Sequence, residues 1–227
     1  MSETDKQAML VVFDCDGVLI DSETIFCTVD AEALTRLGHP TTASEISERF
    51  AGVPHQTAWS QLSAQHNLKL PADWVENLLL ECDRRFQHEL APIPGAANAI
   101  KAIVDRGDQA CVASSTELPS LRGNLDRAGL LTFVEPNVFS VSQVKRAKPA
   151  PDIFLYAASQ MGFDPSETVV IEDSVIGVLA AKRAGMRVFG FTGGGHAYSS
   201  LGSRLSEAGA MHVCRSMDEV TDCLSSQ

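Results

Sequence analysis

The chain has 227 residues, of which 44% are apolar and 21% are charged, a composition that supports a folded protein with a sizeable core and excludes a disordered or fibrous one. Its 29 acidic residues outnumber 18 lysines and arginines, which gives a formal net charge of -11 at pH 7. A field of this sign repels phosphate backbones and anionic lipid surfaces, so neither nucleic acid nor a membrane is an expected partner.

The N-terminal sequence and the cysteines indicate a cytoplasmic protein. The first residues, MSETDKQAM, lack the basic and apolar regions of a secretion signal, and no later apolar run is long enough to span a bilayer. The six cysteines are widely scattered and form no Cys-x-x-Cys pair, which is typical of free thiols in a reducing compartment. We expect a monomer or a weak homo-oligomer without a disulfide framework or a zinc site.

The first predicted element is a buried strand, LVVF at residues 10–13, followed by a helical insertion. Between about Ser22 and Leu90 no convincing strand occurs, and breaks at HPTT and NLKLP separate several helical patterns. The last of these helices has an apolar stripe, interpreted as core packing, at Val75, Leu78, Leu79, Cys82 and Phe86. The APIPG segment at 91–95 is the expected return to the core.

Strands and helices alternate in the rest of the chain. Apolar runs predict buried strands at 110–113, 169–171 and 188–191. Helical patterns lie between them at 96–106, 151–161 and 175–184, and Pro151 suits the first turn of its helix. The alternation predicts an α/β fold with a doubly wound parallel-sheet core. We assign residues 1–20 and 93–227 to this core and residues 21–92 to a small helical domain inserted after the first strand.

Carboxylates follow two of the predicted strands. Asp14 and Asp16 come directly after the first strand, where an extended backbone would direct both side chains to the same side, and Gly17 permits a sharp turn. Glu172 and Asp173 end a second apolar run. Four carboxylates at one sheet edge would repel one another unless a cation offset their charge, and an all-oxygen ligand set favours Mg²⁺.

Such a site is suited to phosphoryl transfer by a carboxylate nucleophile. Asp14 and Asp16 can divide the tasks of nucleophile and proton donor, while Ser114 can bind a phosphate oxygen and Lys148 can balance transition-state charge. Taken alone, an Asp-x-Asp pair more often forms a turn or cap, and a single lysine is usually solvated. A calcium loop is excluded because Gly17 falls too early and the later acidic ligand is missing.

Four ordered motifs resemble the haloacid dehalogenase superfamily. They are FDCDGVLIDSE at 13–23, VASS at 112–115, KPAPDIF at 148–154 and IEDSVIG at 171–177. Within that superfamily the chain is most similar to sugar-phosphate phosphatases and β-phosphoglucomutase. The resemblance covers nearly the whole chain if residues 21–92 are the small helical cap domain of these proteins, and the full acidic set argues against the dehalogenase branch.

The resemblance implies roles for the residues of these motifs. Asp14 would form a phosphoaspartate, Asp16 would act as general acid and then base, and Ser114 and Lys148 would hold the phosphoryl group. Magnesium would contact side chains and one backbone carbonyl, with the ligands Asp14, Asp16 through its carbonyl, Glu172 and Asp173. Ser115 and Thr116 would contact the substrate.

Residues of the cap should select the substrate, a small phosphorylated metabolite. The FAGVPH segment at 50–55 resembles the cap segment that approaches the active site in these proteins, which makes Gly52 and His55 candidate substrate contacts. Arg84 and Arg85 are interpreted as a solvated helix face. Gly193–Gly195, together with His196, could form a mobile loop near the site, but the favoured interpretation is a plain connection.

Three functions are compatible with these motifs. The first is a magnesium-dependent phosphatase that hydrolyses a sugar or polyol phosphate. The second is a phosphosugar mutase. Three residues argue against it, because β-phosphoglucomutase has histidine, arginine and lysine where this chain has Phe26, His55 and Glu117. Glu117 would repel a second phosphate. The third is a non-catalytic phosphosugar-binding protein.

Overall fold

The computed structural model describes residues 8–50 and 52–226. Three sequence features therefore lie partly outside the described residues: the first seven residues used to exclude a secretion signal, position 51 of the FAGVPH segment, and the extreme ends of the predicted core domain. No helix in the described ranges has the length and apolar character needed to cross a membrane.

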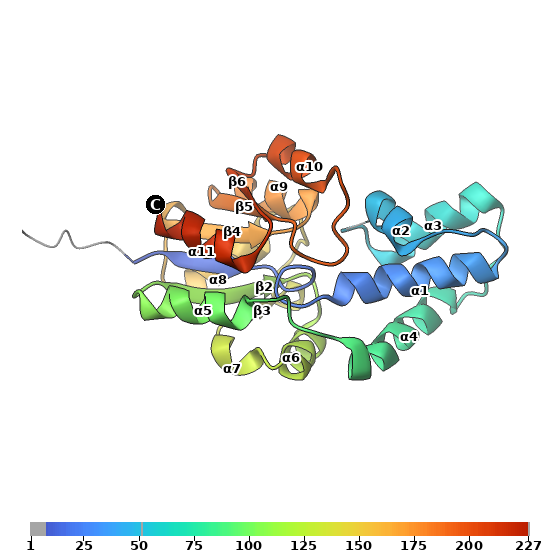
Figure 1. Ribbon diagram of the computed structural model, residues 1–227, viewed down its shortest axis with the longest axis horizontal. Coiled ribbons are helices and arrows are strands. Elements are labelled where there is room, and N and C mark those ends of the chain that lie inside the picture. The colour runs from blue at the N-terminus through green and yellow to red at the C-terminus, as the bar shows by residue number, and fades with distance from the viewer. Residues whose placement is uncertain (1–7, 51, 227) are drawn as a thin grey trace, which may run out of the picture.

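A parallel sheet with helices packed on it forms the larger part of the molecule (Figure 1). Within the described residues it contains six strands in the order β3-β2-β1-β4-β5-β6. Their bounds are β1 Leu10–Phe13, β2 Gln109–Ser114, β3 Val138–Ser140, β4 Thr168–Glu172, β5 Arg187–Phe191 and β6 His212–Cys214. The four predicted strands are confirmed in position, and the doubly wound α/β core is the observed architecture.

Helices cover both faces of this sheet, and each face has its own apolar cluster. On one face Val11 and Phe13 pack with residues of α5, α6, α7 and α11, whose bounds are Ala96–Asp105, Leu118–Arg127, Leu131–Val134 and Met217–Ser225. On the other face Leu10 and Val12 pack with residues of α8, α9 and α10, whose bounds are Asp152–Met161, Val175–Arg183 and Leu201–Ala208. Alternate residues of β1 therefore enter opposite clusters, which explains why the strand is apolar throughout.

Four helices between β1 and α5 lie beyond one end of the sheet (Figure 1). They are α1 Ser22–Arg36, α2 Ala43–Phe50, α3 His55–His66 and α4 Trp74–Glu89. They share a third apolar cluster that includes the fully buried Trp59 and Leu62. We call α1–α4 and their loops the cap.

The chain passes between the sheet and the cap twice, and the two crossings lie side by side. Asp21 N–H donates to the carbonyl of Ala91 at 3.0 Å, and Ile93 N–H donates to the carbonyl of Leu19 at 2.8 Å. The boundary predicted at 20/21 and 92/93 passes through this paired segment, and APIPG forms its return branch.

Some predicted boundaries were wrong or incomplete. The edge strands β3 and β6 were missed because each is only three residues long, too short to show a period. Helix α8 begins at Asp152, so Pro151 precedes the helix instead of occupying its first turn. The apolar stripe of α4 is not wholly core packing, because Val75 and Leu79 line a cavity described below.

Candidate active site

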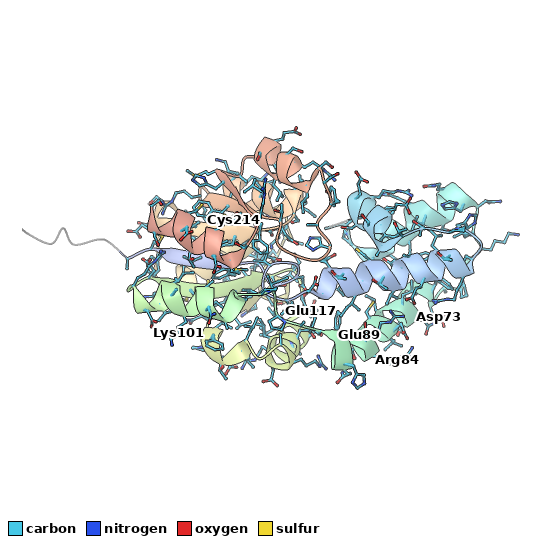
Figure 2. All side chains as sticks on the ribbon, in the orientation of Figure 1. Asp73, Arg84, Glu89, Lys101, Glu117 and Cys214 are labelled. Atoms are coloured by element: carbon cyan, nitrogen blue, oxygen red, sulfur yellow. The ribbon has the colours of Figure 1, made fainter. Side chains whose placement is uncertain are left out.

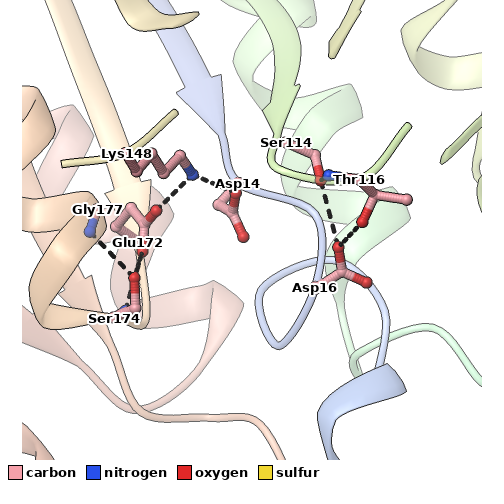
Figure 3. A network of polar contacts seen from close by, with 8 residues as sticks. All are labelled: Asp14, Asp16, Ser114, Thr116, Lys148, Glu172, Ser174 and Gly177. Atoms are coloured by element: carbon pink, nitrogen blue, oxygen red, sulfur yellow. Dashed lines mark hydrogen bonds and ion pairs between the residues drawn. The ribbon is translucent and has the colours of Figure 1, made fainter. Parts of the chain in front are cut away.

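The predicted site residues of the core lie at the carboxyl ends of neighbouring strands. Phe13, the last residue of β1, pairs with Val112 of β2 on one side and Ile171 of β4 on the other. The residues that follow these strands therefore emerge at the same edge of the sheet, where ligands bind in open α/β folds. Figure 3 shows Asp14 between side chains contributed by the neighbouring strands and loops.

Three carboxylates converge at this edge. Asp14, Glu172 and Asp173 are buried, and each offers an oxygen atom such that all three lie within 4.8 Å of one another. Lys148 Nζ lies 2.5 Å from Asp14 Oδ1 and 2.6 Å from Glu172 Oε1 (Figure 3). Hard oxygen ligands in this arrangement fit a divalent cation such as Mg²⁺, and the cluster requires positive charge because it is removed from water.

Burial and charge shift the pKa values of this cluster. Burial raises the pKa of Asp14 well above its ordinary value, and the carboxylates of Glu172 and Asp173 raise it further, against the opposing effect of Lys148. Burial by itself would lower the pKa of Lys148, but its contacts with Asp14 and Glu172 outweigh burial and raise it. Lys148 is therefore a fixed cation at the base of the site.

Asp16 is held apart from the three converging carboxylates. Its Oδ1 accepts a hydrogen bond from Ser22 at 2.7 Å. Its Oδ2 accepts from Thr116 at 2.7 Å and from Ser114 at 3.2 Å (Figure 3). The expectation that four carboxylates gather was therefore too broad: among the described residues, three side chains form the cluster and Asp16 faces hydroxyl groups. Asp14 and Asp16 nevertheless line the same cavity, which is described below.

Two glycines permit the close packing of these carboxylates. Gly17 has a φ of +75°, and a Cβ at this position would lie 1.9 Å from Asp173 Oδ2. Gly177 lies in the first turn of α9, where a Cβ would lie 1.7 Å from Glu172 Oε1. Any side chain at Gly177 would displace the carboxylate of Glu172.

Ser174 fixes the orientation of Glu172 and was missed from the sequence. Ser174 caps α9 by accepting a hydrogen bond from Gly177 N–H at 3.1 Å, and its own N–H and hydroxyl donate to Glu172 Oε2, each at 2.9 Å. The signal was present, because serine directly before a helical pattern is a preferred N-cap residue.

His196 lies at the site, although the favoured sequence interpretation placed it in a plain connection. Its Nε2 lies 3.0 Å from Asp173 Oδ2, and its Nδ1 is buried without a hydrogen-bond partner among the described residues. The interpretation of Gly193–Gly195 as a plain connection was wrong, since a Cβ on Gly194 would lie 2.7 Å from the carbonyl of Gly17. The loop therefore packs against the site and brings His196 to it.

A cavity of about 670 Å³ lies between this cluster and the cap. Core residues line one end, among them Asp14, Asp16, Ser115, Thr116, Lys148, Glu172, Asp173 and His196. Cap residues line the other, among them Glu23, Phe26, Asp30, Phe50, Gly52, Val53, His55, Val75 and Leu79. Gly52 and His55, predicted from the cap motif, therefore line the same cavity as Asp14. Ser114 is not among the lining residues, and its hydroxyl donates to Asp16.

The arginines of α4 lie elsewhere. Figure 2 shows Arg84 on the outer side of the helix, where it pairs with Glu81. Arg85 pairs with Glu81 and with Glu32 of α1. Neither arginine is among the residues that line the cavity. Arg84 is on a solvated face, as predicted, whereas the Arg85 side chain is only 22% exposed and joins α4 to α1.

Comparisons with known proteins assign the family. Residues 8–185 match the haloacid dehalogenase-like hydrolase family. The chain is 29% identical over 187 residues to a 6-phosphogluconate phosphatase of Escherichia coli K12 (82% of this chain, 83% of that protein), and 32% identical over 210 residues to a phosphorylated carbohydrates phosphatase of Thermotoga maritima (90% and 93%). A solved structure of a haloacid dehalogenase-like protein of unknown function from Agrobacterium tumefaciens C58 superposes with a TM-score of 0.90 at 35% identity, covering 97% of this chain and 99% of that one. The chain therefore belongs to the haloacid dehalogenase-like hydrolases.

Proposed function

We propose that this protein is a magnesium-dependent phosphatase that hydrolyses a small sugar or polyol phosphate through a phosphoaspartate at Asp14. The chain is a phosphoric monoester hydrolase by family and by its phosphatase relatives. The observation that carries the mechanism is the convergence of Asp14, Glu172 and Asp173 at the base of a cavity. Lys148 contacts two of these carboxylates, those of Asp14 and Glu172. The name of the Thermotoga relative favours a phosphorylated carbohydrate as the substrate.

In the proposed first step, a carboxylate oxygen of Asp14 attacks phosphorus, and the bond between phosphorus and the ester oxygen breaks. The carboxyl group of Asp16 gives its proton to the departing oxygen. Water then attacks the phosphoaspartate, Asp16 takes a proton from that water, and inorganic phosphate leaves with Asp14 restored.

Neighbouring groups stabilise charge during both steps. Lys148 lies beside the attacking carboxylate and neutralises negative charge on the phosphoryl oxygens. Ser114 and Thr116 hold Asp16 through their hydroxyls and so fix the direction of proton transfer. The oxygen ligands of Asp14, Glu172 and Asp173 would hold Mg²⁺, which when bound supplies further neutralisation of phosphate charge.

A direct assay tests this function. Purified protein should release inorganic phosphate from p-nitrophenyl phosphate and from members of a sugar- and polyol-phosphate panel when Mg²⁺ is present, and a chelator should abolish release. Absence of metal-dependent release from every compound would contradict the proposal. Interconversion of glucose 1-phosphate and glucose 6-phosphate with catalytic glucose 1,6-bisphosphate would favour the mutase instead.

Asp14→Asn tests the nucleophile. The amide has nearly the same size but is a poor nucleophile, so kcat should fall by at least about 10³-fold, as expected when a covalent nucleophile is removed. Circular dichroism should show an unchanged fold. Acid-quenched wild-type protein should carry phosphate on a peptide containing Asp14, and the variant should carry none; labelling of the variant would place the nucleophile elsewhere.

A further inference from the structure

The two ends of the cavity differ in their charged groups. The core end has a lysine among the four carboxylates of Asp14, Asp16, Glu172 and Asp173, whereas the cap end has acidic side chains and, among the described residues, no lysine or arginine. Lys148, at the core end, is the only lysine or arginine among the described residues that line it. The cap end contains two acidic side chains, Glu23 and Asp30, both on α1. The only other charge-bearing side chain there among the described lining residues is His55, at the start of α3.

The position of His55 prevents it from supplying a net positive charge. Its Nε2 lies 3.3 Å from Asp30 Oδ2, and Trp59 Nε1 donates to Asp30 Oδ1 at 2.8 Å, so the buried Asp30 is held by two donors. A protonated His55 makes a neutral pair with Asp30, and a neutral His55 leaves the pair negative. At pH 8, above its raised pKa of about 7, the Glu23 carboxyl group is mostly ionised and makes the cap end negative in both cases.

Most of the remaining surface of the cap end is apolar, although Gln56 also lines it. Phe26 stacks edge-on against the ring of His55 at 5.0 Å, and Val53, Val75 and Leu79 are among the other apolar lining residues. A second phosphate or a carboxylate placed here would lose water and meet acidic groups, which is unfavourable. Carbon-bound hydroxyls, in contrast, can donate to Glu23 while the carbon chain contacts the apolar side chains.

We propose that the cavity selects phosphomonoesters whose remainder is uncharged, such as neutral sugars and polyols, and discriminates through Glu23 and the Asp30–His55 pair against substrates with a second anionic group. This inference rests on the proposed phosphatase function. It separates this chain from the activity named for the Escherichia coli relative, whose substrate has a carboxylate in addition to the phosphate. It also replaces the sequence argument from Glu117, which is exposed and is not among the residues that line the cavity.

Matched substrate pairs test the selection. Glucitol 6-phosphate and 6-phosphogluconate differ at carbon 1, which is a hydroxymethyl group in the first and a carboxylate in the second; glycerol 3-phosphate and 3-phosphoglycerate differ in the same way. Glucose 1-phosphate and glucose 1,6-bisphosphate form a third pair. With Mg²⁺ at pH 8, kcat/KM should be at least about tenfold higher for the uncharged member of each pair that is hydrolysed. Equal or higher kcat/KM for the doubly anionic members would overturn the proposal.

A generic substrate separates failure of this inference from failure of the phosphatase assignment. If p-nitrophenyl phosphate is not hydrolysed either, the proposed function itself fails. If p-nitrophenyl phosphate is hydrolysed but no uncharged member of the pairs is, the phosphatase function stands and the proposed selection is wrong.

Glu23→Gln tests the source of discrimination. The ratio of kcat/KM between the uncharged and doubly anionic members should fall by at least about fivefold, because one repelling carboxylate is lost. Glu32→Gln is the matched control, since Glu32 makes the same charge change on the same helix but is exposed and pairs with Arg85 outside the cavity. The ratio is measured within one preparation, so partial unfolding does not alter it. An unchanged ratio in Glu23→Gln would overturn the role assigned to Glu23.

Discussion

Lys148 is the residue on which the charge balance of the site depends. Its ammonium group contacts Asp14 and Glu172, and its side chain is only 6% exposed. Replacing it leaves buried carboxylates without their cation, which is far more costly than losing a surface ion pair.

We therefore expect Lys148→Met to lower the free energy of unfolding by about 3–5 kcal/mol in chelator, with partial recovery in Mg²⁺, and to lower kcat by at least about 10²-fold. Urea denaturation with and without Mg²⁺ measures the first effect. The control is Lys101→Met on the exposed surface of α5 (Figure 2), which should change neither quantity appreciably. Equal stabilities for wild type and Lys148→Met would show that the cluster needs no internal cation.

Glu23 links stability to pH. Burial, together with the charges of Asp173, Asp16 and Asp30 and against an opposing effect from His196, raises its pKa from 4.5 to about 7. A carboxyl group whose folded pKa is raised favours the folded state below its unfolded pKa, and that contribution is lost as pH rises from about 4.5 through 7.

In metal-free buffer, Glu23→Gln should therefore match the wild type near pH 4 and exceed its free energy of unfolding by up to about 3 kcal/mol above pH 7. Denaturation at a series of pH values measures the difference. If the difference in free energy of unfolding between Glu23→Gln and the wild type became smaller with rising pH, it would contradict the raised pKa.

At the scale of elements, the start of α9 couples the fold to the ligand set. The helix begins beside Glu172, Ser174 caps it, and Gly177 provides the space that the carboxylate occupies. Alanine normally stabilises a helix relative to glycine by about 1 kcal/mol.

In the Gly177→Ala variant, damage to the metal site should outweigh this gain in helix stability. Its Cβ must displace Glu172, so Mg²⁺ affinity and kcat should each fall by at least about tenfold, an effect of the size seen when metal-site geometry is disturbed. Isothermal titration calorimetry measures the affinity. Gly123→Ala in α6 is the matched control, because its new Cβ would meet only the flexible end of Arg127 at 3.4 Å and should be neutral or stabilising. Identical behaviour of the two variants would contradict the role given to Gly177.

At the scale of the whole molecule, hydrogen bonds join the cap to the loop after β5 and to α10. Ser47 of α2 donates to the carbonyl of His196 at 2.6 Å, and Arg204 donates to the carbonyl of Glu48 at 3.3 Å. These contacts close the cap over the cavity, while the paired crossings near Leu19 and Ala91 form the covalent connection. Movement of the cap about these crossings would admit substrate.

Ser47→Ala removes one of these contacts. We expect the closed arrangement to lose about 0.5–1.5 kcal/mol, so that KM rises by a few fold and hydrogen exchange in the loop at 192–200 becomes faster. Ser60→Ala, on the exposed face of α3, should leave exchange unchanged. Small-angle scattering with and without a phosphate analogue gives an independent measure, and indistinguishable exchange and scattering for Ser47→Ala would contradict a closing role.

Local sequence was sufficient for the central fold and for the core of the candidate site. LVVF and VVI predicted β1 and β4 because strands buried on both faces are continuously apolar, and the carboxyl groups that follow them had to emerge at one edge of a parallel sheet. The sequence therefore predicted that Asp14, Glu172 and Asp173 lie close together. The roles of these residues in catalysis remain a prediction.

Only the tertiary structure decided which side chains meet across the chain. The orientation of Asp16 toward Thr116, the approach of His196 to Asp173, and the pairing of His55 with Asp30 beside Glu23 in one cavity depend on loops and helices distant in sequence. Hydrophobic periodicity records which residues are buried but not which buried polar groups become neighbours. The charge at the cap end of the cavity follows from those neighbours, so the sequence pattern had no means of predicting it.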